Sequence, residues 1–231
     1  MLTAPQFLPD RLASVVARIE AAARRAGRDP ATIRLLAVSK QQPAESVRAA
    51  AAAGQKEFGE NYVQEALAKI DAMGDLPLVW HFIGQIQSNK TREVAERFQW
   101  VHTLDRERIA ARLSAQRPHY AGPLEVLIQV KLAEEGGKGG VEPAELPRLA
   151  EFVAGLPRLR LRGLMCIPPP ETDEARQREP YARLRALLAE LNGRGHALDT
   201  LSMGMTADLE AAVTEGATIV RIGTAVFGPR D

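Results

Sequence analysis

The sequence is poor in residues that mark several common classes of protein. It has one cysteine, Cys166, among 231 residues, which excludes an internal disulfide, and four scattered histidines give no metal-binding cluster. It lacks an apolar run long enough to cross a bilayer, and residues 1–30 contain Asp10, Glu20 and several arginines, unlike a signal peptide. The net charge of +1 offers no excess of positive charge to attract nucleic acid. We therefore expect a cytoplasmic protein with no membrane or nucleic-acid partner.

The chain is instead rich in two alternating kinds of segment. Short apolar or β-branched runs are followed by stretches in which apolar residues recur every three or four positions. The runs predict eight strands, at 33–39, 57–60, 78–84, 100–104, 124–131, 159–167, 200–203 and 219–223. Strands that alternate with helices indicate a parallel sheet.

This alternation favours an α/β fold of the (β/α)8 TIM-barrel type. We predict one barrel domain over residues 1–231, with a helix in residues 1–30 before the first strand, because the length suits a closed barrel. Pro180 is expected in the first turn of a helix. An open, doubly wound sheet is the alternative. It would more often carry a glycine-rich fingerprint after the first strand, where this chain reads VSKQ at 38–41.

Lys40 ends the first predicted strand, and a barrel carries its active site on the loops that follow the strands. The preceding run, 35–38, is apolar, so the lysine amine lies at the rim of a dry interior. Desolvation lowers the pKa of a lysine, and the neutral amine is the form that attacks an aldehyde. A lysine at a strand end is more often simply solvated, so this residue alone is a weak indication.

The loops after the seventh and eighth strands have the features of a phosphate site. Barrels frequently bind phosphate at these two loops through backbone N–H groups. Both loops combine a glycine with a hydroxyl residue, and the four residues are Ser202, Gly204, Gly223 and Thr224. A rim lysine beside a phosphate site indicates a phosphorylated aldehyde or ketone. Two ligands fit, either pyridoxal 5'-phosphate (PLP) or the sugar phosphate of a Schiff-base aldolase.

Arg221 separates these two ligands in part. It lies two residues before Gly223, so both residues face the same side of the strand. An arginine that faces the pyridine nitrogen of PLP keeps that nitrogen unprotonated, because two cations would repel each other. A structural ion pair at the barrel mouth is the other explanation of Arg221.

Seven stretches of the chain together resemble the pyridoxal phosphate homeostasis protein family. In chain order they are LAVSK (36–40), FGENYVQE (58–65), WHFIG (80–84), QSNK (87–90), LRGLM (161–165), LSMGM (201–205) and VRIGTAVFG (220–228). The resemblance covers nearly the whole chain, and the set is specific although no single stretch is. The chain departs from the family at 41–43 (QQP), where relatives often have a threonine and another basic residue.

The resemblance implies a barrel similar to the N-terminal domain of alanine racemase, with PLP held as a Schiff base on Lys40. It implies that Arg221 faces the pyridine nitrogen. It further assigns the phosphate to Ser202, Gly223 and Thr224, and it places Asn61 and His81 near the cofactor ring.

We expect a PLP-binding protein of PLP homeostasis rather than an enzyme. PLP enzymes of the racemase fold usually add a β-rich domain that supplies a second base, whereas this chain ends at Asp231, directly after the eighth strand. We therefore expect a monomer that exchanges PLP, with PLP-requiring apo-enzymes as recipients. The alternative is a PLP-dependent amino-acid racemase-type enzyme in which His81 or Tyr62 is the second base.

Overall fold

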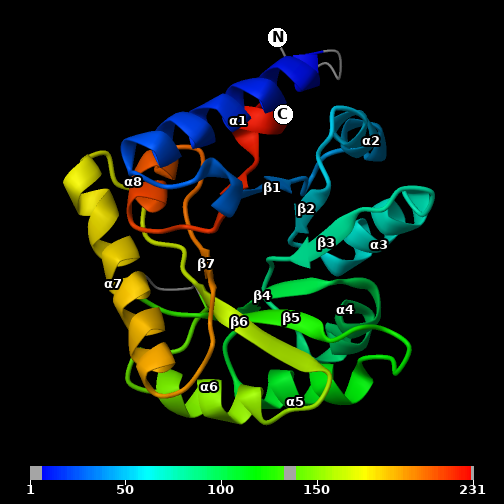
Figure 1. Cartoon of the computed structure of the whole chain (residues 1–231). Coiled ribbons are helices and arrows are strands. Elements are labelled where there is room, and N and C mark those ends of the chain that lie inside the picture. Colours follow the sequence, from blue (N-terminus) through cyan, green and yellow to red (C-terminus); the bar gives the residue numbers. More distant parts are fainter. Residues whose placement is uncertain (1–6, 133–138, 230–231) are drawn as a thin grey trace.

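The computed structural model describes residues 7–132 and 139–229, and its centre is a closed parallel barrel (Figure 1). The eight strands follow one another in chain order, and β8 pairs back to β1. They are β1 (Arg34–Val38), β2 (Glu57–Glu60), β3 (Val79–Phe82), β4 (Trp100–Leu104), β5 (Leu124–Gln129), β6 (Leu159–Met165), β7 (Thr200–Ser202) and β8 (Ile219–Ile222). The predicted (β/α)8 fold is confirmed, and each strand begins and ends within two residues of its predicted run.

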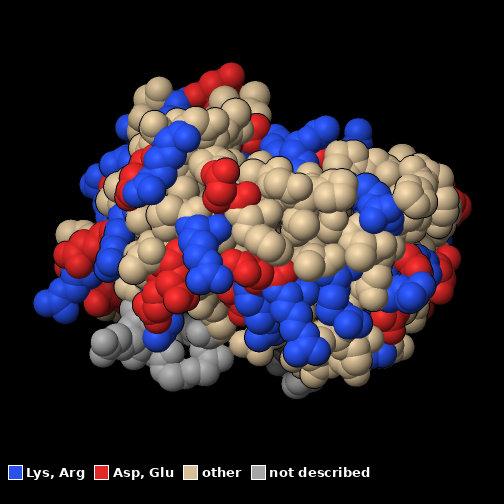
Figure 2. Space-filling model, turned by 90° about the horizontal axis from the view of Figure 1, so that it is seen from below, with Lys and Arg blue, Asp and Glu red and all other residues tan. Residues whose placement is uncertain are grey.

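Helices cover the outside of the barrel. They are α1 (Leu8–Arg25), α2 (Ala44–Ala52), α3 (Val63–Ala72), α4 (Thr91–Arg97), α5 (Glu107–Gln116), α6 (Leu146–Ala154), α7 (Glu174–Gly193), α8 (Leu209–Thr214) and α9 (Thr224–Phe227), with short 3-10 turns at Pro30–Thr32 and Ser88–Lys90. On the face seen in Figure 2, basic and acidic side chains are interspersed, in keeping with the net charge of +1. Within the described ranges, no helix is both long and apolar enough to span a membrane.

The predicted N-terminal helix is present as α1, which packs on α2, α8 and α9. Its buried residues include Leu12, Val15 and Ile19, spaced by three and four positions, so one stripe of the helix faces the barrel. Arg18 on the same helix pairs with Glu210 of α8 at 3.0 Å. Through these contacts α1 lies against the two helices that precede and follow β8, and thus near the loops predicted to bind phosphate.

The prediction for Pro180 is wrong, because α7 begins six residues earlier at Glu174. Asp173 caps this helix by accepting a hydrogen bond from the Arg176 N–H at 2.9 Å. The Glu171 carboxylate also accepts from the N–H groups of Thr172 and Asp173. Pro180 therefore lies inside the helix and leaves one backbone carbonyl without its usual donor.

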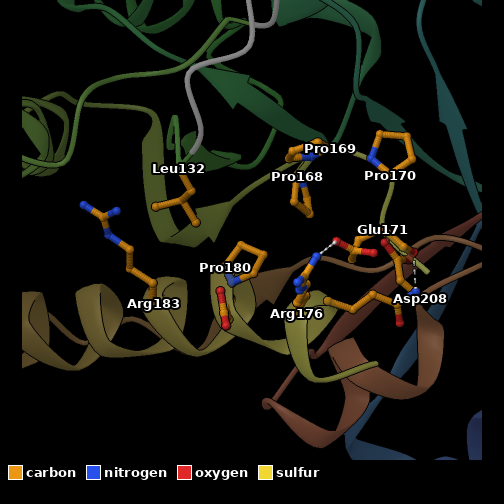
Figure 3. Close-up of a pocket in the computed structure, with 11 residues that line it drawn as sticks. Leu132, Pro168, Pro169, Pro170, Glu171, Arg176, Pro180, Arg183 and Asp208 are labelled. Carbon is orange, nitrogen blue, oxygen red and sulfur yellow. Dashed lines mark hydrogen bonds and ion pairs between the residues drawn. The ribbon is translucent and has the colours of Figure 1, made fainter. Parts of the chain in front are cut away.

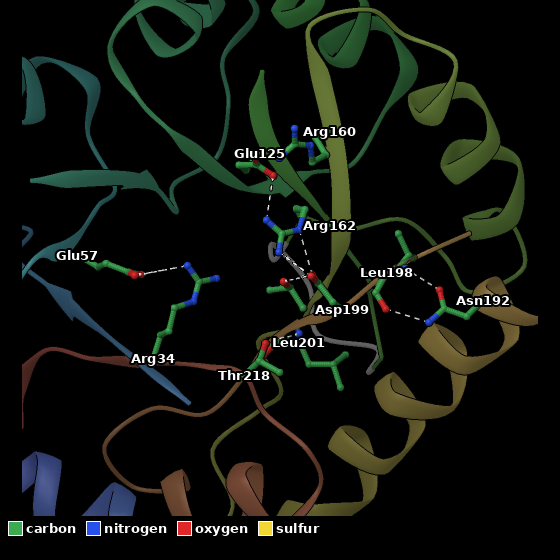
Figure 4. A network of polar contacts seen from close by, with 11 residues as sticks. Arg34, Glu57, Glu125, Arg160, Arg162, Asn192, Leu198, Asp199, Leu201 and Thr218 are labelled. Atoms are coloured by element: carbon green, nitrogen blue, oxygen red, sulfur yellow. Dashed lines mark hydrogen bonds and ion pairs between the residues drawn. The ribbon is translucent and has the colours of Figure 1, made fainter. Parts of the chain in front are cut away.

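The floor of the barrel, at the amino ends of the strands, is closed by paired charged residues (Figure 4), which surround an aromatic ring. The guanidinium groups of Arg34 and Arg162 lie 4.6 and 5.2 Å from the centre of the Trp100 ring. Arg34 pairs with Glu57 at 3.4 Å, and Arg162 pairs with Glu125 at 3.2 Å. Above the floor, the barrel interior is filled by side chains and is not a pore.

Candidate cofactor site

The predicted site residues follow or end five neighbouring strands. Lys40 and Asn61 come after β1 and β2, Ser202 ends β7, and Arg221 lies in β8. Because β7, β8, β1, β2 and β3 pair in that order around the barrel, their carboxyl ends form one arc of the barrel mouth. The remaining predicted residues lie on the same arc, His81 in β3 and both Gly223 and Thr224 directly after β8.

Lys40 is half-buried in a turn whose two flanking residues are held in place. The Ser39 hydroxyl donates to Glu60 Oε1 at 2.6 Å, and the Gln41 N–H donates to the Glu65 carboxylate. Gln41 has a φ of 59°, in the left-handed region that non-glycine residues seldom adopt. The backbone on both sides of Lys40 is thus anchored, which limits the positions that its amine can reach.

A buried lysine joins these anchors. Lys69 of α3 donates to the Ser39 carbonyl at 2.6 Å, to Glu60 at 2.8 Å and to Glu65 at 2.6 Å. We call Ser39, Glu60, Glu65 and Lys69 the lysine clamp. Burial raises the pKa of Glu60, although Lys69 and Ser39 act in the opposite direction. The clamp therefore keeps a carboxylate and an ammonium out of water in order to hold the turn that carries Lys40.

The two loops predicted to bind phosphate are joined through their backbones. The Arg221 N–H donates to the Gly204 carbonyl at 2.9 Å. Gly204 has a φ of +91°, and a Cβ there would lie 2.5 Å from the Cβ of Ala212, so only glycine fits. The N–H groups of Val226 and Phe227 in α9 donate to the Gly223 carbonyl at 2.9 Å, which leaves the exposed Thr224 with an N–H that has no acceptor within the helix. This arrangement suits an anion at the mouth.

Asn61 presents a buried oxygen to the same mouth. A Cβ on Gly84 would lie 2.0 Å from the Asn61 carbonyl oxygen, so the segment after β2 rests directly on the segment after β3. The side-chain oxygen of Asn61 is buried and has no hydrogen-bond partner among the residues described. Asn61 also lines a cavity of about 380 Å3 with Tyr62, Gly84 and Lys90. A ligand that brings a donor would satisfy this oxygen.

His81 and Ser202 lie inside the barrel rather than on its rim. The His81 ring is fully buried and stacks on Trp100, with the ring centres 5.4 Å apart. Its Nδ1 lies 2.9 Å from Nε2 of His102, whose Nδ1 lies 2.9 Å from the Ser202 hydroxyl. Arg221 donates to that hydroxyl at 2.9 Å. The predicted ring contact of His81 and phosphate contact of Ser202 therefore stay predictions.

Sequence reasoning missed His102 and the clamp. His102 lies on β4 and shares the barrel interior with His81 of β3, and this pairing of histidines on consecutive strands is the signal that could have found it. Burial lowers the pKa of His81 and lowers that of His102 well below its ordinary value. Both imidazoles are therefore neutral at physiological pH.

A second, larger groove is lined by a different set of residues (Figure 3). It has a volume of about 510 Å3 and lies between α7 and the segment Pro168–Pro170 that follows β6. Arg176 and Glu171 face each other across it at 3.9 Å. None of the predicted site residues lines it.

Comparison with known proteins first defines the class of fold. Residues 11–231 match the family described as alanine racemase, N-terminal domain. The alanine racemase of E. faecalis has a TM-score of 0.70 with this chain, covering 93% of this chain and 58% of the racemase. At 20% identity that likeness shows the fold alone.

More similar relatives define the family. The chain is 60% identical over 224 residues to the pyridoxal phosphate homeostasis protein of Pseudomonas aeruginosa, covering 97% of this chain and 96% of the relative. It is 54% identical to that of Escherichia coli K12 over 223 residues, 95% of each chain. A structure of PipY from Synechococcus elongatus PCC7942 with PLP bound has a TM-score of 0.84 and 39% identity, covering 96% of this chain and all of PipY. The chain belongs to the pyridoxal phosphate homeostasis protein family.

Proposed function

We propose that this chain binds PLP at its barrel mouth and serves in PLP homeostasis. Its relatives are named for this role, and PipY, 39% identical, has been solved with PLP bound. The observation that carries the proposal is the position of Lys40, held at the end of β1 beside the strand that leads into Gly223 and Thr224. The single, buried thiol supports a cytoplasmic location.

The residues present fit this cofactor. When bound, PLP supplies an aldehyde that condenses with a primary amine. Lys40 would provide the amine, while N–H groups at Gly223 and Thr224 and the Thr224 hydroxyl would hold the phosphate. Arg221 would face the pyridine nitrogen. The unsatisfied oxygen of Asn61 would accept a donor of the ligand.

We further propose that the chain is a carrier rather than an enzyme. A general base must reach the proton that it removes. His81, one of the two residues that could supply a second base, is enclosed by Trp100 and His102. We therefore propose that the protein exchanges PLP with free amines and PLP-requiring apo-enzymes, acting as a monomer over one barrel domain.

Tyr62 gives the enzyme alternative its remaining support. Its side chain is 55% exposed and lines the same cavity as Asn61, where it could approach an amino-acid ligand. Exchange of the α-proton of L- and D-alanine in D2O, followed by NMR, separates the two functions. We expect no exchange above that of free PLP. Fast exchange that Lys40→Ala and Tyr62→Phe both abolish would instead show a racemase-type enzyme.

Reduction of the PLP-loaded protein with borohydride tests the assignment of the lysine. We expect a pyridoxyl group on Lys40, located by peptide mass spectrometry, because the clamp holds the turn that carries this residue. Lys90→Ala is the matched control, since Lys90 is the lysine that lines the neighbouring cavity. It should retain full labelling, whereas Lys40→Ala should lose it. Labelling of another lysine in the unmodified chain would overturn the assignment.

A further inference from the structure

Arg221 is a buried cation without an acidic partner in contact. Its side chain lies inside the barrel and the residue is 5% exposed. Its two acceptors are neutral, the Ser202 hydroxyl and the Cys166 carbonyl, both at 2.9 Å. Among the described residues, no carboxylate lies within ion-pair distance of it. Burial lowers the pKa of Arg221. Cys166, Tyr181 and Asp208 act in the opposite direction, and Asp208 is the carboxylate among them, too far away for an ion pair.

A continuous series of polar contacts also leads from Arg221 through the barrel interior to a second carboxylate. Ser202 contacts His102, and His102 contacts His81, each at 2.9 Å. His81 Nε2 then lies 3.3 Å from Oε2 of Glu57, close enough for an ion pair although its geometry falls short of a hydrogen bond. We call Ser202, His102, His81 and Glu57 the histidine relay. It connects the mouth of the barrel to its floor.

The groups at the two ends of the relay, Arg221 and Glu57, determine which nitrogen of each imidazole carries the proton. A guanidinium only donates, so the Ser202 oxygen accepts from Arg221 and its own proton is free for His102 Nδ1. A neutral His102 then carries its proton on Nε2 and donates to Nδ1 of His81. That leaves the His81 proton on Nε2, pointing at the Glu57 carboxylate. The opposite tautomers would set a lone pair of His81 against that carboxylate.

The floor of the barrel keeps the far end of the relay ionised. Arg34 lies 3.4 Å from Glu57 and is held over the Trp100 ring, as Figure 4 shows for the pair with Glu57. Burial alone would raise the pKa of Glu57, but His81 and Arg34 lower it on balance. Trp100 stacks on His81 with an interplanar angle of 7°, which fixes the orientation of the imidazole.

We infer that the histidine relay is a chain of polar contacts, with its protons all oriented toward Glu57, that positions Arg221 and links it to that carboxylate. Ser202, His102, His81 and Glu57 are thus positioning residues, of which only Ser202 contacts Arg221. Hydrogen bonds that all point the same way polarise one another, so a change at the floor alters the guanidinium at the mouth. The effect on the cofactor rests on the proposed function, in which Arg221 faces the pyridine nitrogen. The relay itself does not.

The ligand-free protein provides the first test, which is independent of PLP. The double variant His119→Gln/His196→Gln removes the two histidines outside the relay, so that nitrogen-15 NMR reports only His81 and His102. We expect both rings to be neutral and protonated on Nε2 from about pH 6 to about pH 8. A ring protonated on Nδ1, or on both nitrogens, overturns the relay whether or not the protein binds PLP.

Glu57→Gln tests the long-range effect, with Glu125→Gln as the matched control. Both carboxylates lie at the floor and pair with arginines, but only Glu57 contacts a histidine. We expect Glu57→Gln to shift the His81 nitrogen signals and the absorption band of bound PLP, and Glu125→Gln to shift neither. If Glu57→Gln leaves both the His81 nitrogen signals and the PLP absorption band unchanged, as Glu125→Gln should, the proposal is overturned.

A second pair of variants keeps the proposal testable if Glu57→Gln does not fold. His102→Leu removes both hydrogen bonds of the central ring, whereas His102→Gln keeps one acceptor and one donor. We expect PLP binding about tenfold weaker in His102→Leu, with partial recovery in His102→Gln. Equal binding by the parent, His102→Leu and His102→Gln would overturn the proposal.

Discussion

Two buried polar clusters, each with a glutamate from strand β2, accommodate a buried cation in different ways. The lysine clamp places an ammonium in direct contact with two carboxylates. The histidine relay instead separates a cation from a carboxylate by a hydroxyl and two neutral rings. The clamp holds the backbone around Lys40, whereas the relay holds the side chain of Arg221. The comparison shows that a backbone position can be fixed by ion pairs, while a buried guanidinium can be held by neutral acceptors alone.

The two clusters should differ most in what their loss does to stability. Lys69→Met leaves Glu60 buried without its cation, and we expect the free energy of unfolding to fall by about 3–5 kcal/mol. His102→Leu leaves neutral groups unsatisfied, and we expect a loss of about 1–3 kcal/mol. Urea unfolding measures both.

Two controls sharpen this comparison. The double variant Lys69→Met/Glu60→Gln should recover part of the loss, because it removes the uncompensated charge as well. Lys90→Met, at a partly exposed lysine, should stay within about 0.5 kcal/mol of the parent. A smaller loss of unfolding free energy for Lys69→Met than for His102→Leu would contradict the expectation that the clamp contributes more to stability than the relay.

The clusters should also respond to pH with opposite sign. The pKa of Glu60 is raised above 4.5 by burial, so the contribution of this group to stability is present below that pH and is lost as pH rises through the folded-state pKa. The pKa of His102 is lowered well below 6.5, mainly by burial and also by His81, Arg221 and Arg34. Its contribution is present above that pH and is lost as pH falls.

Unfolding measured from about pH 4 to about pH 8 tests these signs. Relative to the parent, Glu60→Gln should gain stability as pH rises above 4.5, and His102→Gln should gain stability as pH falls below 6.5. His196→Gln, which alters a histidine outside both clusters, should follow the parent. Parallel pH profiles for Glu60→Gln and His102→Gln would show that the clusters do not differ in this way.

The sequence was sufficient to predict features that depend on short segments. The eight strands follow from local apolar runs, and the positions of Lys40 and Arg221 at one mouth follow from the barrel topology. The start of α7 was predicted too late in the chain, because hydrogen bonds of Asp173 and Glu171 begin the helix before Pro180. The relay could not be predicted, because its contact between His102 and Ser202 joins residues one hundred positions apart. The clamp likewise depends on which face of α3 lies against β2.

The smallest expected effect distinguishes Thr224 from Ser202 by how each variant changes the binding of PLP and of pyridoxal. Both were assigned to the phosphate by resemblance, yet Thr224 is exposed at the start of α9 while the Ser202 hydroxyl already contacts Arg221 and His102. Thr224→Val should weaken the binding of PLP severalfold and leave that of pyridoxal, which lacks the phosphate, nearly unchanged. Ser202→Ala should weaken both to the same extent, because it acts through Arg221. Equilibrium dialysis with PLP and with pyridoxal measures both affinities. If Ser202→Ala weakened the binding of PLP alone, Ser202 would contact the phosphate and would not act through the relay.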